Sequence, residues 1–310
     1  MIQSSPITNF LLITTCNFTP KFGRCSPAPA YPMDSVLLET LAPMEGSAPM
    51  TIHTFSGSQF SAKVLTALDA NQIPHYVTFV SLMPKSRVLP SGGKLVPEMV
   101  VGEGPERVVV ADSEAILRWL DAHRGTRLFP SEQAAAISAR ASDGVLAGAA
   151  IYYNWVHTPT YRTTMRAVAV SKRGMPGWIC VGRGQLADYL TSKQRGTFAT
   201  LAAKQLGGIS EDEMRDEPAV RRLLVAELAE LQSTLQADAQ PYLLPGDAPT
   251  AADFSVFGQL ERIVGDMGDA QIPCSLPELL SQEPLARLRA WHQGMRQRHP
   301  IRFKGKRAPP

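Results

Sequence analysis

The residue whose type and position best suit chemistry is Ser58. It lies five residues before Lys63 in the segment SQFSAKV, after a Ser-Gly turn and at the start of an apolar helical pattern. A hydroxyl at a helix start lies among free backbone N–H groups and the positive end of the helix dipole. It would stabilise an anion such as a thiolate and lower the pKa of the parent thiol. One alternative is that Ser58 is a plain N-cap serine without a ligand. Another is that Ser56 or Ser61, and not Ser58, is the serine at the helix start.

A second candidate is the pair Asp112-Ser113, which precedes the apolar residues Ala115 and Ile116. A helix N-terminus is a natural carboxylate site, because its N–H groups and its dipole both favour negative charge. The pair follows a predicted β-hairpin, which brings it to the edge of a sheet. The alternative is an ordinary Asp/Ser cap without a ligand.

A third pattern is structural. In the segment PTAADF at 249–254, Thr250 and Asp253 have the spacing of a capping box. Thr250 would bond the backbone N–H three residues on, and Asp253 would reach back to the start of the helix. This predicts the start of a buried helix and no catalytic role.

The segment 50–130 contains the elements that must position the first two candidates. Alternating or β-branched residues predict four strands, at 51–55, 75–80, 98–101 and 107–110. A helix up to residue 70 separates the first two strands, a Pro- and Gly-containing loop covers 81–95, and residues 102–106 make a hairpin turn. Strands joined across a helix should be parallel with a right-handed crossover, and the last pair antiparallel.

After residue 130 the strand pattern stops, and an all-helical domain is predicted over 131–298. Apolar spacing predicts its helices at 131–157, 183–205, 216–239, 250–267 and 284–297. The segment 158–182 reads as a linker, and residues 299–310 as a basic, solvated tail. The first of these helices carries four ring-bearing residues that either face a substrate cleft or belong to the core: Tyr152, Tyr153, Trp155 and His157.

Residues 1–48 differ from the rest in composition. They are rich in Ser, Thr and Pro and contain no acidic residue before Asp34. The lack of a periodic apolar pattern predicts a disordered extension. The composition also suits an organelle transit peptide, and Met33, Met44 and Met50 are alternative start sites.

Charge and composition exclude several classes of function. The 310 residues are 44% hydrophobic and 19% charged, with a net charge of +3 that is too small to predict nucleic-acid binding. The longest apolar stretch, 144–156, is shorter than the ~20 residues that span a bilayer, so no membrane span is expected. The four cysteines show no CxxC pair and no metal-ligand spacing. No metal site is therefore predicted, and a reducing compartment is favoured.

The order of elements and the local motifs together resemble the glutathione S-transferase superfamily over residues 50–298. The resemblance implies an α/β N-terminal thioredoxin-like domain at 50–130 that binds glutathione, followed by an all-α C-terminal domain at 131–298. Ser58 matches the family's catalytic serine or cysteine, which makes this chain serine-type, with its class unresolved. The capping box at 250–253 matches the start of a buried helix in the family's second domain.

The resemblance assigns glutathione contacts to four residues. The segment Lys94-Leu95-Val96-Pro97 is similar to the family's loop that ends in Val and a cis-proline. Val96 would pair its backbone with the cysteinyl part of glutathione, as an added β-strand does. Pro97 would be cis, the alternative being a simple proline at a strand start. Ser113 would receive the γ-glutamyl carboxylate, and Asp112 would take part in holding the α-ammonium group.

Two departures from the family pattern leave two functions open. One extra residue displaces Lys94 from Val96, and residues 81–93 lack the clear second helix that supplies glutathione contacts in the family. The first function is a glutathione transferase, in which Ser58 activates the thiol of glutathione, the co-substrate, for conjugation or isomerisation of a small electrophile. Serine suits this better than thiol–disulfide exchange, which needs a cysteine. The second function is a non-catalytic, metaxin-like interaction or scaffold protein with the same fold.

The resemblance also leaves a homodimer open. The expected location is the cytoplasm, or a mitochondrion or plastid if residues 1–48 are a transit peptide.

Overall fold

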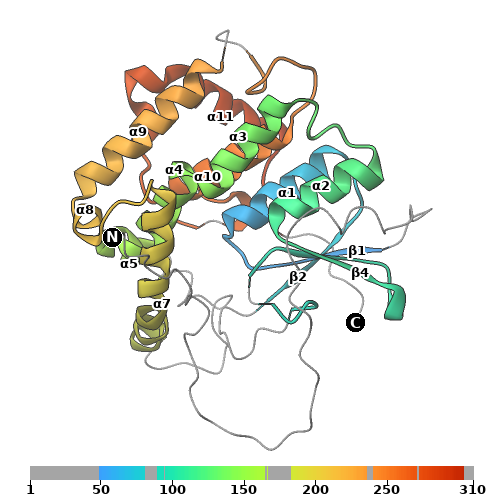
Figure 1. The fold of residues 1–310 in the computed structure, drawn as a ribbon, viewed down its shortest axis with the longest axis horizontal. Helices are drawn as coiled ribbons and strands as arrows, with labels where there is room; N and C mark the ends of the chain where they lie inside the picture. The colour runs from blue at the N-terminus through green and yellow to red at the C-terminus, as the bar shows by residue number, and fades with distance from the viewer. Residues whose placement is uncertain are drawn as a thin grey trace, which may run out of the picture. The chain divides into compact units, whose positions relative to one another are not determined.

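The computed structural model describes residues 49–80, 89–93, 95–164, 166, 183–235, 240–270 and 272–303. Two N-terminal helices, α1 (Gln59–Ala70) and α2 (Ser113–Arg124), lie side by side over one face of a sheet (Figure 1). Four strands form that sheet: β1 (Met50–Thr54), β2 (Tyr76–Phe79), β3 (Glu98–Val101) and β4 (Val108–Ala111).

The sheet has the mixed topology that the sequence predicts. Its order is β2-β1-β3-β4, with β1 parallel to β2 across α1 and both other pairs antiparallel. Ile52 of β1 pairs with Met99 of β3, and both side chains are fully buried. Full burial of such a side chain contributes about 1.5–3 kcal/mol, so this face of the sheet is a main source of the region's stability.

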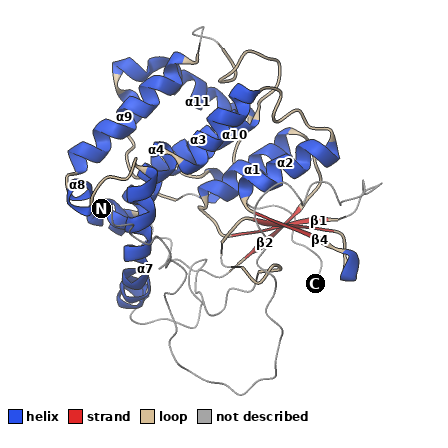
Figure 2. Ribbon diagram, viewed as in Figure 1, coloured by secondary structure: helices blue, strands red, loops and turns tan. Residues whose placement is uncertain are grey.

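From Glu132 onward, all described helices and turns belong to an all-α region (Figure 2). This region and the α/β region before it confirm the predicted fold class. The helices are α3 (Glu132–Asp143), α4 (Val145–Ile151), α5 (Thr158–Thr163), α7 (Arg183–Gln205), α8 (Glu211–Arg215), α9 (Glu217–Ser233), α10 (Ala251–Ile263) and α11 (Ala286–Arg298).

Helix α10 links the two regions. It is buried along its whole length and contacts both α1 and α3. A Cβ atom at Gly258 would lie 2.7 Å from the carbonyl oxygen of Gln59, so only glycine allows α10 to approach α1 this closely. The predicted capping box of Thr250 and Asp253 is present at the start of this helix.

The single helix predicted over 131–157 is wrong. The chain breaks at Gly144, whose φ of −102° and ψ of −158° are extended. A Cβ atom at this position would lie 2.5 Å from the carbonyl oxygen of Arg140, so the break needs glycine. After α4 the chain continues as a π-helical turn, η3 (Tyr152–Val156). The Ala-rich apolar pattern runs through both features, although the turn-forming pair Asp143-Gly144 was an available signal for the break.

Other boundaries also differ from the sequence prediction, and helix α9 ends at Ser233 instead of residue 239. The beginning of the predicted linker is α5, where Pro159 lies in the first helical turn and needs no hydrogen-bond partner for its nitrogen. Helix α10 ends at Ile263 instead of near residue 267. The start of the predicted tail is not frayed, because Ile301 and Phe303 are buried.

Several predictions fall outside the described residues. They concern the extension at 1–48, residues 81–88, Lys94, and the tail after residue 303. Within the described part of the chain, no helix has both the length and the apolar character needed to cross a bilayer.

Candidate functional site

Three predicted site segments leave the sheet at the same end. Glu98, the first residue of β3, pairs with the end of β1 on one side and with Ala111, the last residue of β4, on the other. Ser58 follows β1, Pro97 precedes β3 and Asp112 follows β4. The N–H of Asp112 also donates to the carbonyl of Pro97 at 3.3 Å, which joins two of the segments directly. Sheet register therefore brings these segments to one edge.

Ser58 is the N-cap of α1. Its hydroxyl oxygen accepts the backbone N–H of Ser61 at 3.2 Å, and the residue is 3% exposed. Ser61 lies inside the helix and is fully buried, so Ser58 holds the helix start among the nearby serines. A hydroxyl has one hydrogen and two lone pairs. Because the cap bond uses a lone pair, the hydroxyl hydrogen can still be donated to an anion.

The turn before Ser58 is fixed by a close contact with the helical region. Gly57 has a φ of +91°, a conformation that glycine adopts without strain. A Cβ atom there would lie 2.1 Å from the Cδ1 atom of Ile272. The segment containing Ile272 is itself held to the helical region, since the hydroxyl of Ser275 donates to Asn154 at 3.1 Å. The position of Ser58 thus depends on both regions.

Asp112 and Ser113 begin α2 as the sequence predicts. The Oδ1 atom of Asp112 accepts the N–H groups of Glu114 and Ala115, at 2.8 and 3.2 Å. Asp112 is exposed and has a φ of +81°, whereas Ser113, the first helical residue, is 2% exposed. Asp112 is therefore the cap, and both of these bonds use the same one of its two carboxylate oxygens.

The Val96–Pro97 peptide bond is cis, which confirms that prediction. Sequence reasoning missed the next residue, Glu98, which is 1% exposed. Its carboxylate accepts the N–H of Ser91 at 3.1 Å and also the hydroxyl of Ser91. A carboxylate directly after a Val-Pro pair was the available signal. Glu98 ties the described part of the preceding loop to the site, and Leu95 lies exposed beside it.

A buried ion pair connects α1 to α2. The Nζ atom of Lys63 lies 2.6 Å from Oε2 of Glu114 and 3.0 Å from the hydroxyl of Ser142. The hydroxyl of Ser138 donates to the same Glu114 oxygen at 2.8 Å. Burial lowers the pKa of Lys63, and the charge and hydrogen bond of Glu114 oppose that shift. The sequence placed Lys63 in a motif but gave no sign of its partner 51 residues later.

The aromatic candidates on η3 belong to the helical core. Tyr152 and Tyr153 are buried, and the hydroxyl of Tyr153 donates to Glu217 at 2.7 Å. Burial, followed by the charges of Glu217 and Asp216, raises the pKa of Tyr152 to about 12. The ring of Tyr152 stacks on His157, with ring centres 5.7 Å apart. These contacts support the core interpretation.

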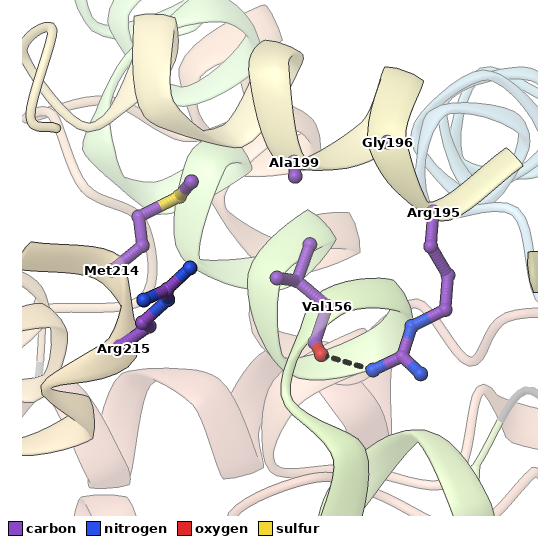
Figure 3. Close-up of a pocket in the computed structure, with 6 residues that line it drawn as sticks. All are labelled: Val156, Arg195, Gly196, Ala199, Met214 and Arg215. Atoms are coloured by element: carbon purple, nitrogen blue, oxygen red, sulfur yellow. Dashed lines mark hydrogen bonds between the residues drawn. The ribbon is translucent and has the colours of Figure 1, made fainter. Parts of the chain in front are cut away.

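A hollow of about 270 Å³ lies between η3, α7 and α8 (Figure 3). None of the predicted site residues lines it. Arg195, on one wall, donates to the carbonyls of Trp155 and Val156 at 3.1 and 2.5 Å. Arg215, on the opposite side, pairs with Asp212 at 3.2 Å. Both guanidinium groups are thus hydrogen-bonded or paired within the protein. We therefore interpret the hollow as a packing feature of the helices and not as the candidate site.

The part of the chain that the structure describes contains no group of three or more His, Cys, Asp and Glu side chains that could hold a metal ion. The sheet edge instead offers a hydroxyl at one helix start, a capped second helix start, and the backbone of Val96 between them. Such a set can hydrogen-bond an elongated ligand with an anionic group at each helix start.

Solved structures similar to this one share little sequence identity with it. No family model matches the sequence, and no curated protein matches it. The structure is similar to Gtt2 from Saccharomyces cerevisiae, with 18% identity over 81% of this chain and 98% of that one, and a TM-score of 0.48. A glutathione transferase family member from Pseudomonas fluorescens pf-5, solved with two glutathione bound, gives 14% identity, coverage of 84% and 93%, and a TM-score of 0.46. Maleylacetoacetate isomerase from Anaeromyxobacter dehalogenans 2CP-1 gives 19% identity, coverage of 85% and 96%, and a TM-score of 0.42.

Proposed function

We propose that this protein is a glutathione-dependent transferase that conjugates or isomerises a small electrophile. The observation that carries the proposal is the sheet register, which brings Ser58, Val96-Pro97 and Asp112-Ser113 to one edge. These are the residues that the family resemblance assigns to glutathione. In this proposal residues 50–130 bind glutathione, and the helical domain at 131–298 forms the binding site for the electrophile.

The thiol, the cysteinyl backbone and the γ-glutamyl group of glutathione each have a proposed partner. The hydroxyl of Ser58 donates its hydrogen to the thiolate, and the N-terminus of α1 adds a favourable field, so the pKa of the thiol falls. The thiolate is the nucleophile that attacks the electrophile. Val96 pairs its backbone with the cysteinyl part, Ser113 receives the γ-glutamyl carboxylate, and Asp112 holds the α-ammonium group.

The test compares two serines that cap helices in the same way. Ser131 caps α3 by accepting the N–H of Ala134 at 3.2 Å, the same distance as the bond from Ser61 to Ser58. Ser58→Ala and Ser131→Ala should each reduce stability by about 1 kcal/mol. Only Ser58→Ala should reduce turnover of an electrophilic aryl halide, by on the order of 100-fold, because it removes a hydrogen-bond donor to a reacting anion.

Two measurements separate the steps. Calorimetric titration of the purified protein reports glutathione binding, and the ultraviolet absorbance of the bound thiolate against pH reports its ionisation. The Ser58→Ala variant should bind glutathione and ionise it at higher pH than the wild-type protein. Equal thiolate absorbance and turnover in both serine variants would remove Ser58 from the mechanism.

The second candidate function is a non-catalytic, metaxin-like interaction or scaffold protein. Two observations favour it: Ser58 is only 3% exposed, and Lys94 is displaced in the sequence by one residue. This candidate predicts no retention on immobilised glutathione and no thiolate absorbance. Saturable micromolar binding of glutathione would count heavily against it.

The proposal extends to assembly and location. A homodimer is the assembly that the resemblance leaves open, and sedimentation equilibrium tests it. We propose the cytoplasm as the location, because the spacing of the cysteines in the sequence favours a reducing compartment. The alternative is a mitochondrion or plastid, if residues 1–48 are a transit peptide. Imaging of the full chain fused at its C-terminus to a fluorescent protein distinguishes them.

A further inference from the structure

The ion pair of Lys63 and Glu114 lies close to both helix starts of the proposed glutathione site. Lys63 is in the second turn of α1, five residues after Ser58, and Glu114 directly follows Ser113 in the first turn of α2. The two side chains meet at 2.6 Å, and Lys63 is 2% exposed. A single contact therefore connects the helix that begins at the proposed thiol site to the helix that begins at the proposed carboxylate site.

The helical region holds this pair in place. The hydroxyl of Ser142 accepts from Lys63, and that of Ser138 donates to Glu114, so α3 contacts both members. Ser138 is itself within 2.8 Å of the hydroxyl of Ser255 on α10. Glu114 also pairs with Arg118 at 3.3 Å, but that guanidinium is 46% exposed and its charge is screened by solvent. Lys63 is therefore the main neutralising charge for Glu114.

The position of Glu114 matters for an anionic ligand, because a carboxylate in the first turn of α2 stabilises the helix start but competes with a bound anion. Its carboxylate lies at the helix start where the γ-glutamyl carboxylate of glutathione is proposed to bind, and two carboxylates repel each other. Without Lys63, two carboxylates, those of Asp112 and Glu114, would lie without a buried counter-charge at the helix start that must attract a third. With Lys63 the charge of Glu114 is neutralised, so the positive end of the helix dipole favours the carboxylate of the ligand, while Asp112 accepts the N–H groups of Glu114 and Ala115.

We propose that Lys63 is a positioning residue for glutathione: it neutralises Glu114 and fixes the spacing between the Ser58 and Ser113 helix starts. This inference rests on the proposed function. It predicts that the sign of the charge left behind, and not simply the loss of an ion pair, decides how tightly glutathione binds.

The experiment measures the Kd of glutathione by calorimetry, and KM and kcat with an aryl halide, for four variants of the full chain. Lys63→Met leaves Glu114 unneutralised and should weaken glutathione binding about tenfold, with a larger effect on KM than on kcat. Lys63→Arg keeps the charge and should bind nearly as the wild-type protein does. Glu114→Gln removes the repelling charge and should bind glutathione at least as tightly as the wild type. The double variant Lys63→Met/Glu114→Gln should recover most of the lost affinity.

The matched control is Arg140→Met. Arg140 of α3 pairs with Glu227 of α9 at 3.0 Å, with the carboxylate 8% and the guanidinium 34% exposed, and it also pairs with the exposed Glu230. Its loss also breaks a partly buried ion pair between helices, but away from α1 and α2, and should leave glutathione affinity unchanged. Thermal unfolding of all variants checks that each is folded at the assay temperature.

The outcomes are distinguishable. Wild-type affinity in folded Lys63→Met, or a tenfold loss in Glu114→Gln, would overturn the inference and leave the proposed function intact. If Lys63→Met does not fold, Glu114→Gln and Lys63→Arg still decide, because a purely structural pair predicts weaker binding in Glu114→Gln. Absence of glutathione binding in the wild-type protein and in Arg140→Met would overturn the proposed function and this inference together.

Discussion

Asp112 and Asp253 both bond the start of a helix, but their carboxylates have very different surroundings. Asp253 is fully buried, and its two oxygens accept from the backbone N–H of Leu243, the N–H and hydroxyl of Thr250, and the indole N–H of Trp291. Asp112 is exposed, and one of its oxygens accepts two backbone N–H groups of its own helix.

The comparison shows how one capping chemistry can serve two purposes. At Asp253 the chain itself supplies four donors, two in the cap residue Thr250 and two outside the helix being capped. That carboxylate is closed to ligands and joins α10 to α11 and the preceding loop. At Asp112 the described hydrogen bonds involve a single oxygen, so the cap remains open at the edge where the site segments meet. A structural cap and a candidate site therefore differ less in their sequence motif than in whether the chain supplies hydrogen-bond donors to both carboxylate oxygens.

The largest expected effect is at the closed cap. Asp253→Ala should reduce the free energy of unfolding by at least about 3 kcal/mol, because each buried donor left without a partner costs about 1–3 kcal/mol. Equilibrium unfolding in urea measures this loss. Glutathione affinity of the protein that remains folded should not change.

Asp253→Asn is the control for this prediction. Its amide keeps one acceptor oxygen and the same shape, so the loss should be smaller than in the alanine variant. A change below 1 kcal/mol in Asp253→Ala would contradict the assignment of Asp253 as the structural cap.

The same contrast explains how far the sequence predicts the molecule. Both caps were predicted, because capping needs residue types at fixed spacing within one turn. The four strands, the parallel first pair and the antiparallel last pair were predicted for a similar reason, since alternation and turn residues are local, whereas the pairing of β1 with β3 was not predicted. Ser58, Asp112 and Ser113 lie where local patterns placed them, at helix starts.

Most features that the sequence reasoning missed depend on contacts between distant segments. The break at Gly144 is the exception, because it is local and the turn-forming pair Asp143-Gly144 could have marked it. The partner of Lys63 lies 51 residues away, and the contact of Gly57 with Ile272 joins the two regions. Packing of this kind is set by the assembled fold and not by the residues next to each member of the pair.

The second prediction concerns the open cap and glutathione affinity. Asp112→Asn should change the free energy of unfolding by less than about 0.5 kcal/mol, because asparagine caps helices as well as aspartate and tolerates a positive φ. It removes the negative charge proposed to hold the α-ammonium group. Exposed ion pairs contribute about 0.2–1 kcal/mol, so glutathione should bind about two- to fivefold more weakly. Calorimetric titration and urea unfolding of the same preparation give both values. Unchanged affinity would restrict Asp112 to its capping role.

The smallest expected effect is on pH dependence, and it compares a histidine from each of the two regions. His53 lies on β1 beside Glu98, near the open cap. His299 contacts Phe254, next to the closed cap, with ring centres 6.2 Å apart. Burial lowers the pKa of both side chains below the ordinary value of 6.5. At His53 the charge of Glu98 opposes the lowering of the pKa, and the charge of Arg107 adds to it. At His299 the charge of Arg298 adds to the lowering.

The sign follows from proton binding. The unfolded chain binds these protons more tightly than the folded chain. The contribution of the two neutral histidines to the free energy of unfolding is therefore fully present above about pH 6.5 and is lost as pH decreases through the folded-state pKa values. Between pH 7.5 and pH 5.5 the free energy of unfolding of the wild-type protein should decrease. His299→Gln should reduce this decrease more than His53→Gln does, because no carboxylate offsets the pKa shift of His299. Urea unfolding of the three proteins at both pH values measures this. A larger effect at His53 would mean that burial of the sheet face outweighs Glu98, and that the region around the candidate site is the more acid-sensitive of the two.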